Sequence, residues 1–295
     1  MSLTNTEIEN RIASTAAIQH HYDVGNEFYA LWLDRETMSY TSANYDAKDM
    51  SLEAAQIAKL DYHAHSIGLQ PGHRVLDIGC GWGGFLSHAV QKYGAVQGVG
   101  LTLSAEQKQW VDAKGLPQLN CKLESWVDHH PEQPYDGIVS IEAFEAFARP
   151  HLTSVEKTEV YREFFRRCHE WLVPNGLLSL QMIPYGNATP EEFDTFISQD
   201  IFPESNFPRL LEVASAFEYL FEIDVIRNRR HDYVTTLKEW RQRLSQQRSA
   251  AIALVGEATV KRYDRYFRIS EFTLQNGNCD LLQLSLRKIN HPKKP

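Results

Sequence analysis

A short apolar strand that runs into a glycine-rich turn constrains this chain more than any other segment. Residues Val75–Gly84 read VLDIGCGWGG. Gly79 and Gly81 allow tight backbone geometry with positive φ and let a ligand approach the backbone closely. Asp77 stands where a carboxylate can meet a cation or a polar group of a ligand. The motif favours an adenosyl cofactor, although nicotinamide and flavin sites share it and a ligand-free turn is the structural alternative.

Strand and helix patterns alternate through most of the chain. Segments with strand character cover residues 73–79, 96–102, 120–125, 136–141, 176–183, 221–227 and 281–288. Segments with helical character between them cover residues 85–93, 105–113, 155–172 and 208–220. This alternation predicts an α/β fold with a doubly wound, mostly parallel seven-stranded sheet and right-handed crossovers.

Three regions are additional to a minimal doubly wound domain. Residues 1–65 are polar and aromatic-rich and end in a helical pattern, so they predict an N-terminal helical lid. Residues 66–295 then form the cofactor-binding domain, with cover insertions at about 184–220 and 235–275. We expect the lid and the insertions to cover the carboxyl ends of the strands, where open α/β sheets bind ligands.

Composition excludes several classes of function. The net charge of −8 argues against nucleic-acid binding, which requires a basic face. The four cysteines are widely spaced and form no CxxC, so we expect reduced thiols and no metal site. A polar N-terminus and the lack of long apolar runs predict a cytoplasmic protein with at most peripheral membrane contact. The oligomeric state stays open, with a homodimer as one option.

Seven motifs, in the same order, resemble the S-adenosylmethionine-dependent cyclopropane fatty acid synthase and mycolic acid methyltransferase family. They are HHYDVGNEFYALWLD (20–34), MSYTSANY (38–45), VLDIGCGWGG (75–84), GLTLSAEQ (100–107), IVSIEAFEAF (138–147), IFP (201–203) and DYVTTLKEW (232–240). The resemblance runs from about His20 to Lys288 and is more specific than any single glycine loop. It implies that residues 66–295 form a class I methyltransferase domain that binds S-adenosylmethionine.

The resemblance also implies how the chain holds the cofactor's two ends. Tyr40 and Thr41 match a pair that closes over the methionine end. Gly79 and Gly81 match glycines that pass beneath the adenosyl moiety. Ile141 matches a position near the sulfonium.

Positions after the second and third strands complete the implied cofactor site. Thr102, Leu103 and Gln107 match the positions that hold the ribose. The chain reads GLTLS where many adenosyl sites carry an acidic residue, which suits the family and weakens the nicotinamide interpretation. Trp126, which follows Ser125, matches an aromatic residue that flanks the adenine, and ordinary core packing is the alternative for it.

The catalytic positions depart from the family pattern. In lipid-cyclopropanating relatives an alkene attacks the methyl group and the resulting cation loses a proton, with a bicarbonate held by Cys, Glu, His, Ile and Tyr thought to be the base. Glu145, Ile183 and Tyr233 match this set, whereas Ser42 stands at the Cys position and Gln181 at the His position. Ser42 and Gln181 can donate hydrogen bonds to an anion, but neither carries a proton near neutral pH as histidine does. Bicarbonate binding is therefore in doubt.

A second resemblance concerns the acceptor. The segment SIEAFEAF is similar to the SIE-x-FE pattern of plant alkaloid N-methyltransferases, where paired glutamates and a following His engage an amine. Glu142 and Glu145 lie three residues apart, so in a helical turn they would share a face. Two carboxylates at one site could stabilise a developing positive charge. Ala146 replaces the His, and the alternative for Glu142 is a solvent-facing carboxylate at a helix start.

These features predict a methyltransferase that methylates carbon in a small or medium lipophilic acceptor of the natural-product kind. Three alternatives stay open: a cyclopropane fatty-acyl-phospholipid synthase, a small-molecule amine N-methyltransferase, and a cofactor-binding scaffold without activity. The retention of both Glu145 and Tyr233 argues against the last.

Overall fold

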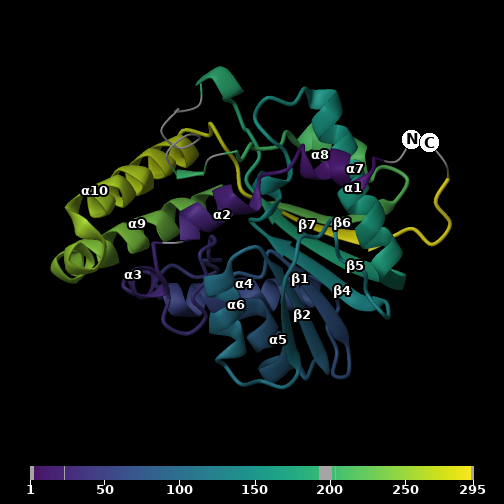
Figure 1. Ribbon diagram of the computed structural model, residues 1–295, viewed down its shortest axis with the longest axis horizontal. Coiled ribbons are helices and arrows are strands. Elements are labelled where there is room, and N and C mark those ends of the chain that lie inside the picture. The colour runs from purple at the N-terminus through teal and green to yellow at the C-terminus, as the bar shows by residue number, and fades with distance from the viewer. Residues whose placement is uncertain (1–2, 23, 193–200, 203, 294–295) are drawn as a thin grey trace.

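A seven-stranded mixed sheet forms the centre of the molecule in the computed structural model, which describes residues 3–22, 24–192, 201–202 and 204–293 (Figure 1). Pro203 of the IFP motif lies outside the described residues. The strands are β1 (Arg74–Ile78), β2 (Gln97–Thr102), β3 (Leu119–Leu123), β4 (Tyr135–Ile141), β5 (Leu172–Met182), β6 (Phe221–Asn228) and β7 (Leu282–Lys288). Their order is β3-β2-β1-β4-β5-β7-β6. Strands β1 to β5 pair in parallel, and β7 runs antiparallel to both of its neighbours. The predicted doubly wound, mostly parallel seven-stranded sheet is confirmed.

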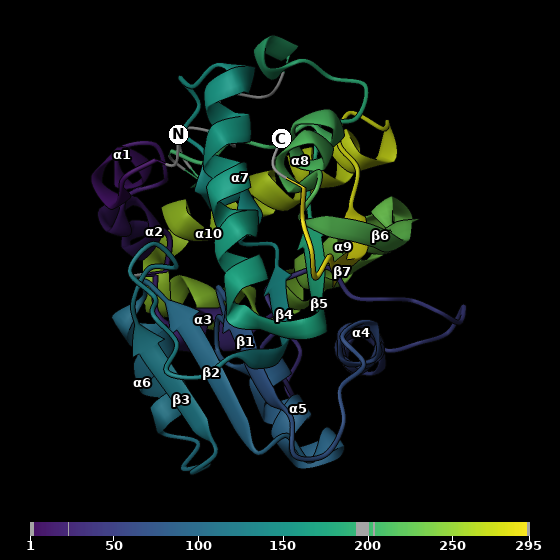
Figure 2. The same ribbon diagram turned by 90° about the vertical axis from the view of Figure 1, so that its right-hand side faces the viewer.

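Helices cover both faces of the sheet, which explains why its inner strands are continuous apolar runs. On one face lie α4 (Leu52–Ser66), α5 (Gly84–Tyr93) and α6 (Ala105–Asp112), and their buried side chains form one core cluster with the strands. On the other face lie α1 (Asn5–Glu9), α7 (Ser154–Trp171) and α8 (Leu210–Phe217), whose apolar residues form a second cluster. Helices α7 and α8 pack side by side (Figure 2).

A third core cluster lies beyond the sheet. It joins α3 (Asn26–Ala30) to α9 (Arg230–Gln246) and α10 (Arg248–Gln275). In Figure 1, α9 and α10 project together from the sheet. Its centre is aromatic: the ring of Trp32 lies 5.6 Å from that of Trp240 and 5.1 Å from that of Phe267. Gly256, with φ 79°, interrupts the helical backbone of α10. Two segments far apart in sequence therefore share one hydrophobic core.

The N-terminal 65 residues contribute to all three clusters and do not form a single helical unit. Ile8 of α1 packs with α7, Phe28 of α3 packs with α10, and Leu60 of α4 packs beneath the sheet. The remaining helix of this region, α2 (Thr15–Tyr22), lies between α1 and α3 in the chain. Among the described residues, no helix has both the length and the apolar character needed to cross a membrane.

Candidate active site

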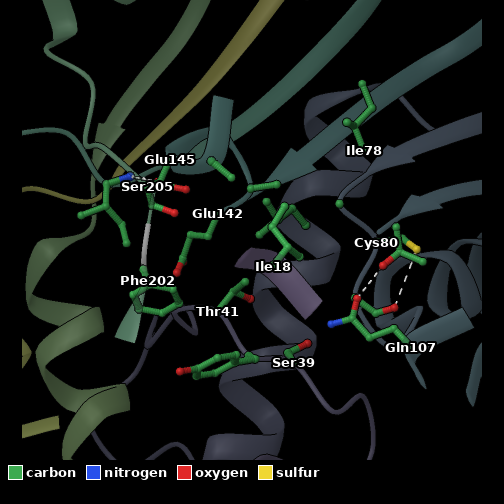
Figure 3. Close-up of a pocket in the computed structure, with 18 of the residues that line it drawn as sticks. Ile18, Ser39, Thr41, Ile78, Cys80, Gln107, Glu142, Glu145, Phe202 and Ser205 are labelled. Atoms are coloured by element: carbon green, nitrogen blue, oxygen red, sulfur yellow. Dashed lines mark hydrogen bonds between the residues drawn. The ribbon is translucent and has the colours of Figure 1, made fainter. Parts of the chain in front are cut away.

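One cavity of about 260 Å³ opens at the carboxyl ends of the parallel strands. In Figure 3, Cys80 and Gln107 lie at one end, Glu145, Phe202 and Ser205 at the other, with Thr41 and Ile18 between them. Most of the residues that the sequence predicts for the site line this single space. They are Tyr40, Thr41, Asp77, Gly79, Gly81, Thr102, Leu103, Gln107, Ser125, Trp126, Ile141, Glu142, Glu145, Ile183 and Tyr233.

Gly79 and Gly81 of the first turn are required for different structural reasons. Both have positive φ, 82° at Gly79 and 52° at Gly81. A Cβ on Gly79 would lie 2.4 Å from the Cβ of Ala143, so this glycine lets the turn pack against the segment after β4. A Cβ on Gly81 would meet no described atom within 4 Å and would project into open space. Gly81 therefore leaves room for a ligand against the backbone.

Asp77, the penultimate residue of β1, carries a buried carboxyl group with one oxygen that has no hydrogen-bond partner among the described residues. Its side chain is 3% exposed, and Oδ1 has no hydrogen bond to any described residue. Burial raises its pKa from 3.8 to about 7, and the positive charge of Lys59 opposes this rise. Because buried polar atoms are normally hydrogen-bonded, a donor from a ligand is expected here.

The turn after β2 presents a second polar pair to the cavity. Thr102 Oγ1 donates to Gln107 Oε1 at 2.7 Å, and both side chains are buried. Ser104 caps α6 and accepts from the backbone N–H of Gln107 at 3.3 Å, which fixes where Gln107 enters the helix. The carbonyl of Leu103 accepts from Gln19 of α2 at 3.1 Å, so α2 is tied to this end of the cavity.

Trp126 closes the cavity beyond β3 and belongs to the core as well. It is 3% exposed, its ring packs on Phe147 and Phe164, and Arg167 lies 5.6 Å from its centroid. Glu124, which sequence reasoning missed, also lines the cavity, and its Oε1 contacts His129 Nδ1 at 2.7 Å. The signal for Glu124 was its place directly after a strand of a parallel sheet. Together with the room at Gly81 and the unpaired Asp77, this wall fits an adenosyl cofactor.

Glu142 lies outside any helical turn, which corrects the prediction that it shares a helix face with Glu145. It has φ 51° and precedes the short 3-10 helix η1 (Phe144–Phe147). Its backbone N–H donates to the carbonyl of Gln181 at 2.8 Å, which holds this unfavourable φ in place. The alternative of a solvent-facing carboxylate is also wrong, since Oε1 accepts from the Ser42 N–H at 2.8 Å and from Gln181 Nε2 at 2.6 Å.

Glu145 is the more deeply buried of the two glutamates, with 8% of its surface exposed. Its Oε1 accepts from the backbone N–H of Ile183 at 2.5 Å. Burial raises its pKa from 4.5 to about 8; the Ile183 hydrogen bond opposes this rise and the charge of Glu142 adds to it. Burial also raises the pKa of Glu142, against its hydrogen bonds and the charge of Lys59. The two carboxyl groups therefore lie in one apolar space and disfavour each other's ionisation.

Ser42 and Gln181 lie behind Glu142 and do not line the cavity. Gln181 Oε1 accepts from Gln283 Nε2 at 2.7 Å and contacts His63 Nε2 at 3.2 Å, so its amide nitrogen faces Glu142. The hydroxyl of Ser42 donates to the carbonyl of Ala43 at 3.3 Å. Both residues thus orient a carboxylate, and their catalytic assignment stays a prediction.

Three candidate functional residues carry no motif of their own. Lys59 and His63 lie on the buried face of α4, where their spacing with Gln56 was the available signal. The pKa of His63 falls to about 3, chiefly through burial, so its ring is neutral. The phenol of Tyr266 on α10 lies near those of Tyr40 and Tyr233, and the phenol of Tyr233 lies near the carboxyl group of Glu142. These four polar side chains therefore come together although they lie far apart in the sequence.

Comparisons with known proteins agree with this geometry. Residues 9–284 match the model of the mycolic acid cyclopropane synthetase family. The cyclopropane mycolic acid synthase MmaA2 of Mycobacterium tuberculosis is 34% identical over 291 residues, which cover 92% of this chain and 96% of that protein. The S-adenosylmethionine-dependent methyltransferase UmaA of the same organism is 34% identical over 290 residues, with coverage of 92% and 96%.

Solved structures give the same result. The structure of MmaA2 from Mycobacterium tuberculosis has a TM-score of 0.84 at 32% identity and covers 94% of this chain and 99% of its own. The mycolic acid cyclopropane synthase CmaA1 complexed with S-adenosylhomocysteine (SAH) and CTAB also has a TM-score of 0.84 at 32% identity, with coverage of 93% and 98%. Coclaurine N-methyltransferase, at 24% identity and a TM-score of 0.78, shares the fold.

The sheet order and the cavity at its carboxyl edge define a class I methyltransferase, an enzyme that uses S-adenosylmethionine as methyl donor. Within that class, the chain belongs to the mycolic acid cyclopropane synthetase family. The sequence-based expectation of family, cofactor and enzyme class is confirmed.

Replacing Gly81 should separate cofactor binding from folding. In Gly81→Val the side chain fills space that the ligand needs, so we expect calorimetry to show no binding of SAH. Gly115→Val is the matched control, because Gly115 also has positive φ (62°) with open space at its Cβ but is exposed outside the cavity. It should suffer a similar backbone strain and still bind. Equal affinity in both variants would contradict the placement of the cofactor.

The buried carboxyl of Glu145 should make stability depend on pH. Folded Glu145 keeps its proton up to about pH 8, whereas the unfolded chain releases it near 4.5. The folded state binds more protons in this window, so its stability falls as pH rises, by up to about 1.4 kcal/mol per pH unit. Glu145→Gln should remove this loss and be more stable than wild type at pH 8 but not at pH 4. Urea denaturation at both pH values measures this difference in stability. A parallel pH dependence of stability in the two proteins would contradict the prediction.

Proposed function

We propose that this enzyme transfers the methyl group to carbon, an alkene or an electron-rich ring, of a small or medium lipophilic acceptor. The observation that supports this most is a pair of carboxyl groups at the apolar end of the cavity, of which Glu145 is buried and Glu142 half-buried. Ile183, Phe202, Phe207 and Leu274 supply apolar wall there, with Glu142 and Glu145 among them. The structure of a relative complexed with CTAB agrees with a lipophilic acceptor.

Methyl transfer requires little covalent catalysis by the protein. Bound S-adenosylmethionine supplies an electrophilic methyl group, so alignment and exclusion of water dominate the rate. Transfer of that group to an acceptor carbon, with loss of the sulfur–carbon bond, would leave positive charge on the acceptor. Glu142, held in place by Ser42 and Gln181, stabilises that charge. Binding of a cationic cofactor would lower the pKa of Glu145, so that its carboxyl group releases its proton to water; the carboxylate could then accept the proton that the acceptor loses.

Charge in the cavity argues against a bicarbonate-dependent cyclopropane synthase. Among the described lining residues Lys59 is the single lysine or arginine, whereas Asp77, Glu124, Glu142 and Glu145 are acidic. The amide donor of Gln181 that would hold an anion already binds Glu142, as does the backbone N–H of Ser42, while the Ser42 hydroxyl donates to the carbonyl of Ala43. Burying a further anion beside these carboxyl groups is costly.

Methylation of an amine remains the second candidate because the two carboxyl groups also suit an ammonium ion. Ala146 lines the cavity where the alkaloid enzymes carry a histidine, so a neutral base for the amine is missing at that place. Carbon methylation needs no base before the transfer, which is why we favour it.

The experiment compares acceptor classes with a labelled methyl donor. The enzyme is incubated with labelled S-adenosylmethionine and with isoprenoid alkenes, phenols, cyclic amines, or vesicles of unsaturated phospholipid. Each assay is run with bicarbonate removed and then restored. We expect labelled carbon–methyl products that do not respond to bicarbonate and no ring formation in phospholipid. Efficient phospholipid cyclopropanation that requires bicarbonate, or label found on nitrogen alone, would overturn the proposal.

Glu145→Gln tests the catalytic role of the deeper carboxyl group. The amide keeps its shape and can still accept from Ile183, but it can neither balance positive charge nor accept a proton. We expect turnover to fall on the order of 10²-fold while the affinity for SAH is nearly unchanged. Glu163→Gln is the control: this glutamate is 4% exposed and pairs with Arg167 outside the cavity, so it should cost stability without lowering turnover of the folded enzyme. Equal losses of turnover in both variants would indicate a structural role.

A further inference from the structure

Lys59 is a buried lysine whose ammonium group is only partly satisfied by the protein. It lies on α4, is 1% exposed and lines the cavity. Its Nζ donates to Thr41 Oγ1 at 2.6 Å, which uses one of three donors. Burial lowers its pKa to about 8, while the charges of Asp34, Glu142 and Asp77 oppose this fall. Burying a lysine is costly, so its persistence here calls for a specific partner.

Anchoring the loop that follows Ser39 does not explain why a buried lysine stands at position 59. Gln56, one turn earlier on α4, already donates through Nε2 to the carbonyls of Thr41 at 2.8 Å and Ser39 at 3.3 Å. The loop is therefore anchored by a neutral side chain on the same helix face. Lys59 adds a positive charge at the cavity wall, which the neutral side chain of Gln56 cannot supply.

The wall that carries Lys59 also carries the complementary charge. Asp77 lines the same cavity with a buried Oδ1 that has no partner among the described residues. An ammonium donor and a carboxylate acceptor that face one space match a ligand that carries a carboxylate and an ammonium on one carbon. The amino-acid end of S-adenosylmethionine is such a group, and hydrogen bonds between charged partners are the stronger kind.

We propose that Lys59 binds the α-carboxylate of the cofactor's methionine end, while Asp77 accepts from its α-ammonium. This adds a cofactor-binding residue outside the glycine motif and gives α4 a direct role in the site. Thr41, which Lys59 contacts, then orients the ammonium of Lys59 toward the ligand. The proposal concerns binding of the cofactor and does not depend on which acceptor the enzyme uses.

The test uses three ligands that lose the amino-acid end in steps. SAH carries the carboxylate and the ammonium, its decarboxylated form carries only the ammonium, and methylthioadenosine carries neither. Calorimetry with Lys59→Met should show SAH binding weakened by about 10- to 100-fold, the range expected for one hydrogen bond between charged groups. Binding of the two smaller ligands should be unchanged. Lys59→Arg should retain part of the affinity for SAH.

Other patterns of loss would overturn the proposal. If SAH and its decarboxylated form weaken together, Lys59 acts as a counter-ion of Asp77. If all three ligands weaken together, its role is structural. Lys157→Met is the control, because Lys157 is also buried but pairs with Glu212 at 2.9 Å; it should change stability and not the preference among ligands. If Lys59→Met does not fold, the wild-type protein still decides: equal affinity for SAH and its decarboxylated form would exclude a carboxylate contact.

Discussion

The burial of acidic groups around one cavity is the constraint on which the rest of the site depends. A carboxylate taken out of water must find donors, gain a cation or keep its proton. Three of the four acidic residues that line the cavity differ in this respect: backbone and amide donors bind Glu142, the charge of Lys59 partly offsets the burial of Asp77, and Glu145 keeps its proton to about pH 8. A cationic cofactor and a cationic stage of the reaction fit such a space because both relieve the same electrostatic cost.

The second requirement is that distant segments hold Glu142 at an unfavourable backbone angle. The loop at Ser42, the end of β5 at Gln181 and α9 at Tyr233 all contact its carboxyl group. Behind them, His63 of α4 and Gln283 of β7 fix the amide of Gln181. Because these partners come from five elements, the position of one side chain depends on correct packing of the sheet, the cover helices and the N-terminal region together.

Much of the fold could be predicted because its signals are local. The turn with Gly79 and Gly81 follows β1 directly, and strand and helix patterns alternate with the expected periods. The same is true of the cofactor wall, since Thr102 and Trp126 follow strands that a parallel sheet must bring to one edge. The prediction that Glu142 lies on a helix face is wrong because its backbone angle is imposed by Gln181, which lies 39 residues away in sequence.

The contacts behind the cavity wall could not be predicted from the sequence for a related reason. Lys59 and His63 lie on a helix whose polar spacing resembles a solvated face, and only packing against the loop at Thr41 and the end of β5 shows that this face is buried. Gln181 stands where the family pattern has a residue associated with an anion, yet here its side chain donates to the carboxylate of Glu142, beside the backbone N–H of Ser42. The exchange changes the electrostatic preference of the acceptor site, because donors already bound to a carboxylate cannot also neutralise a second anion. A site of this kind stabilises positive charge directly, which is the physical reason to expect an acceptor that becomes cationic and passes its proton to the protein.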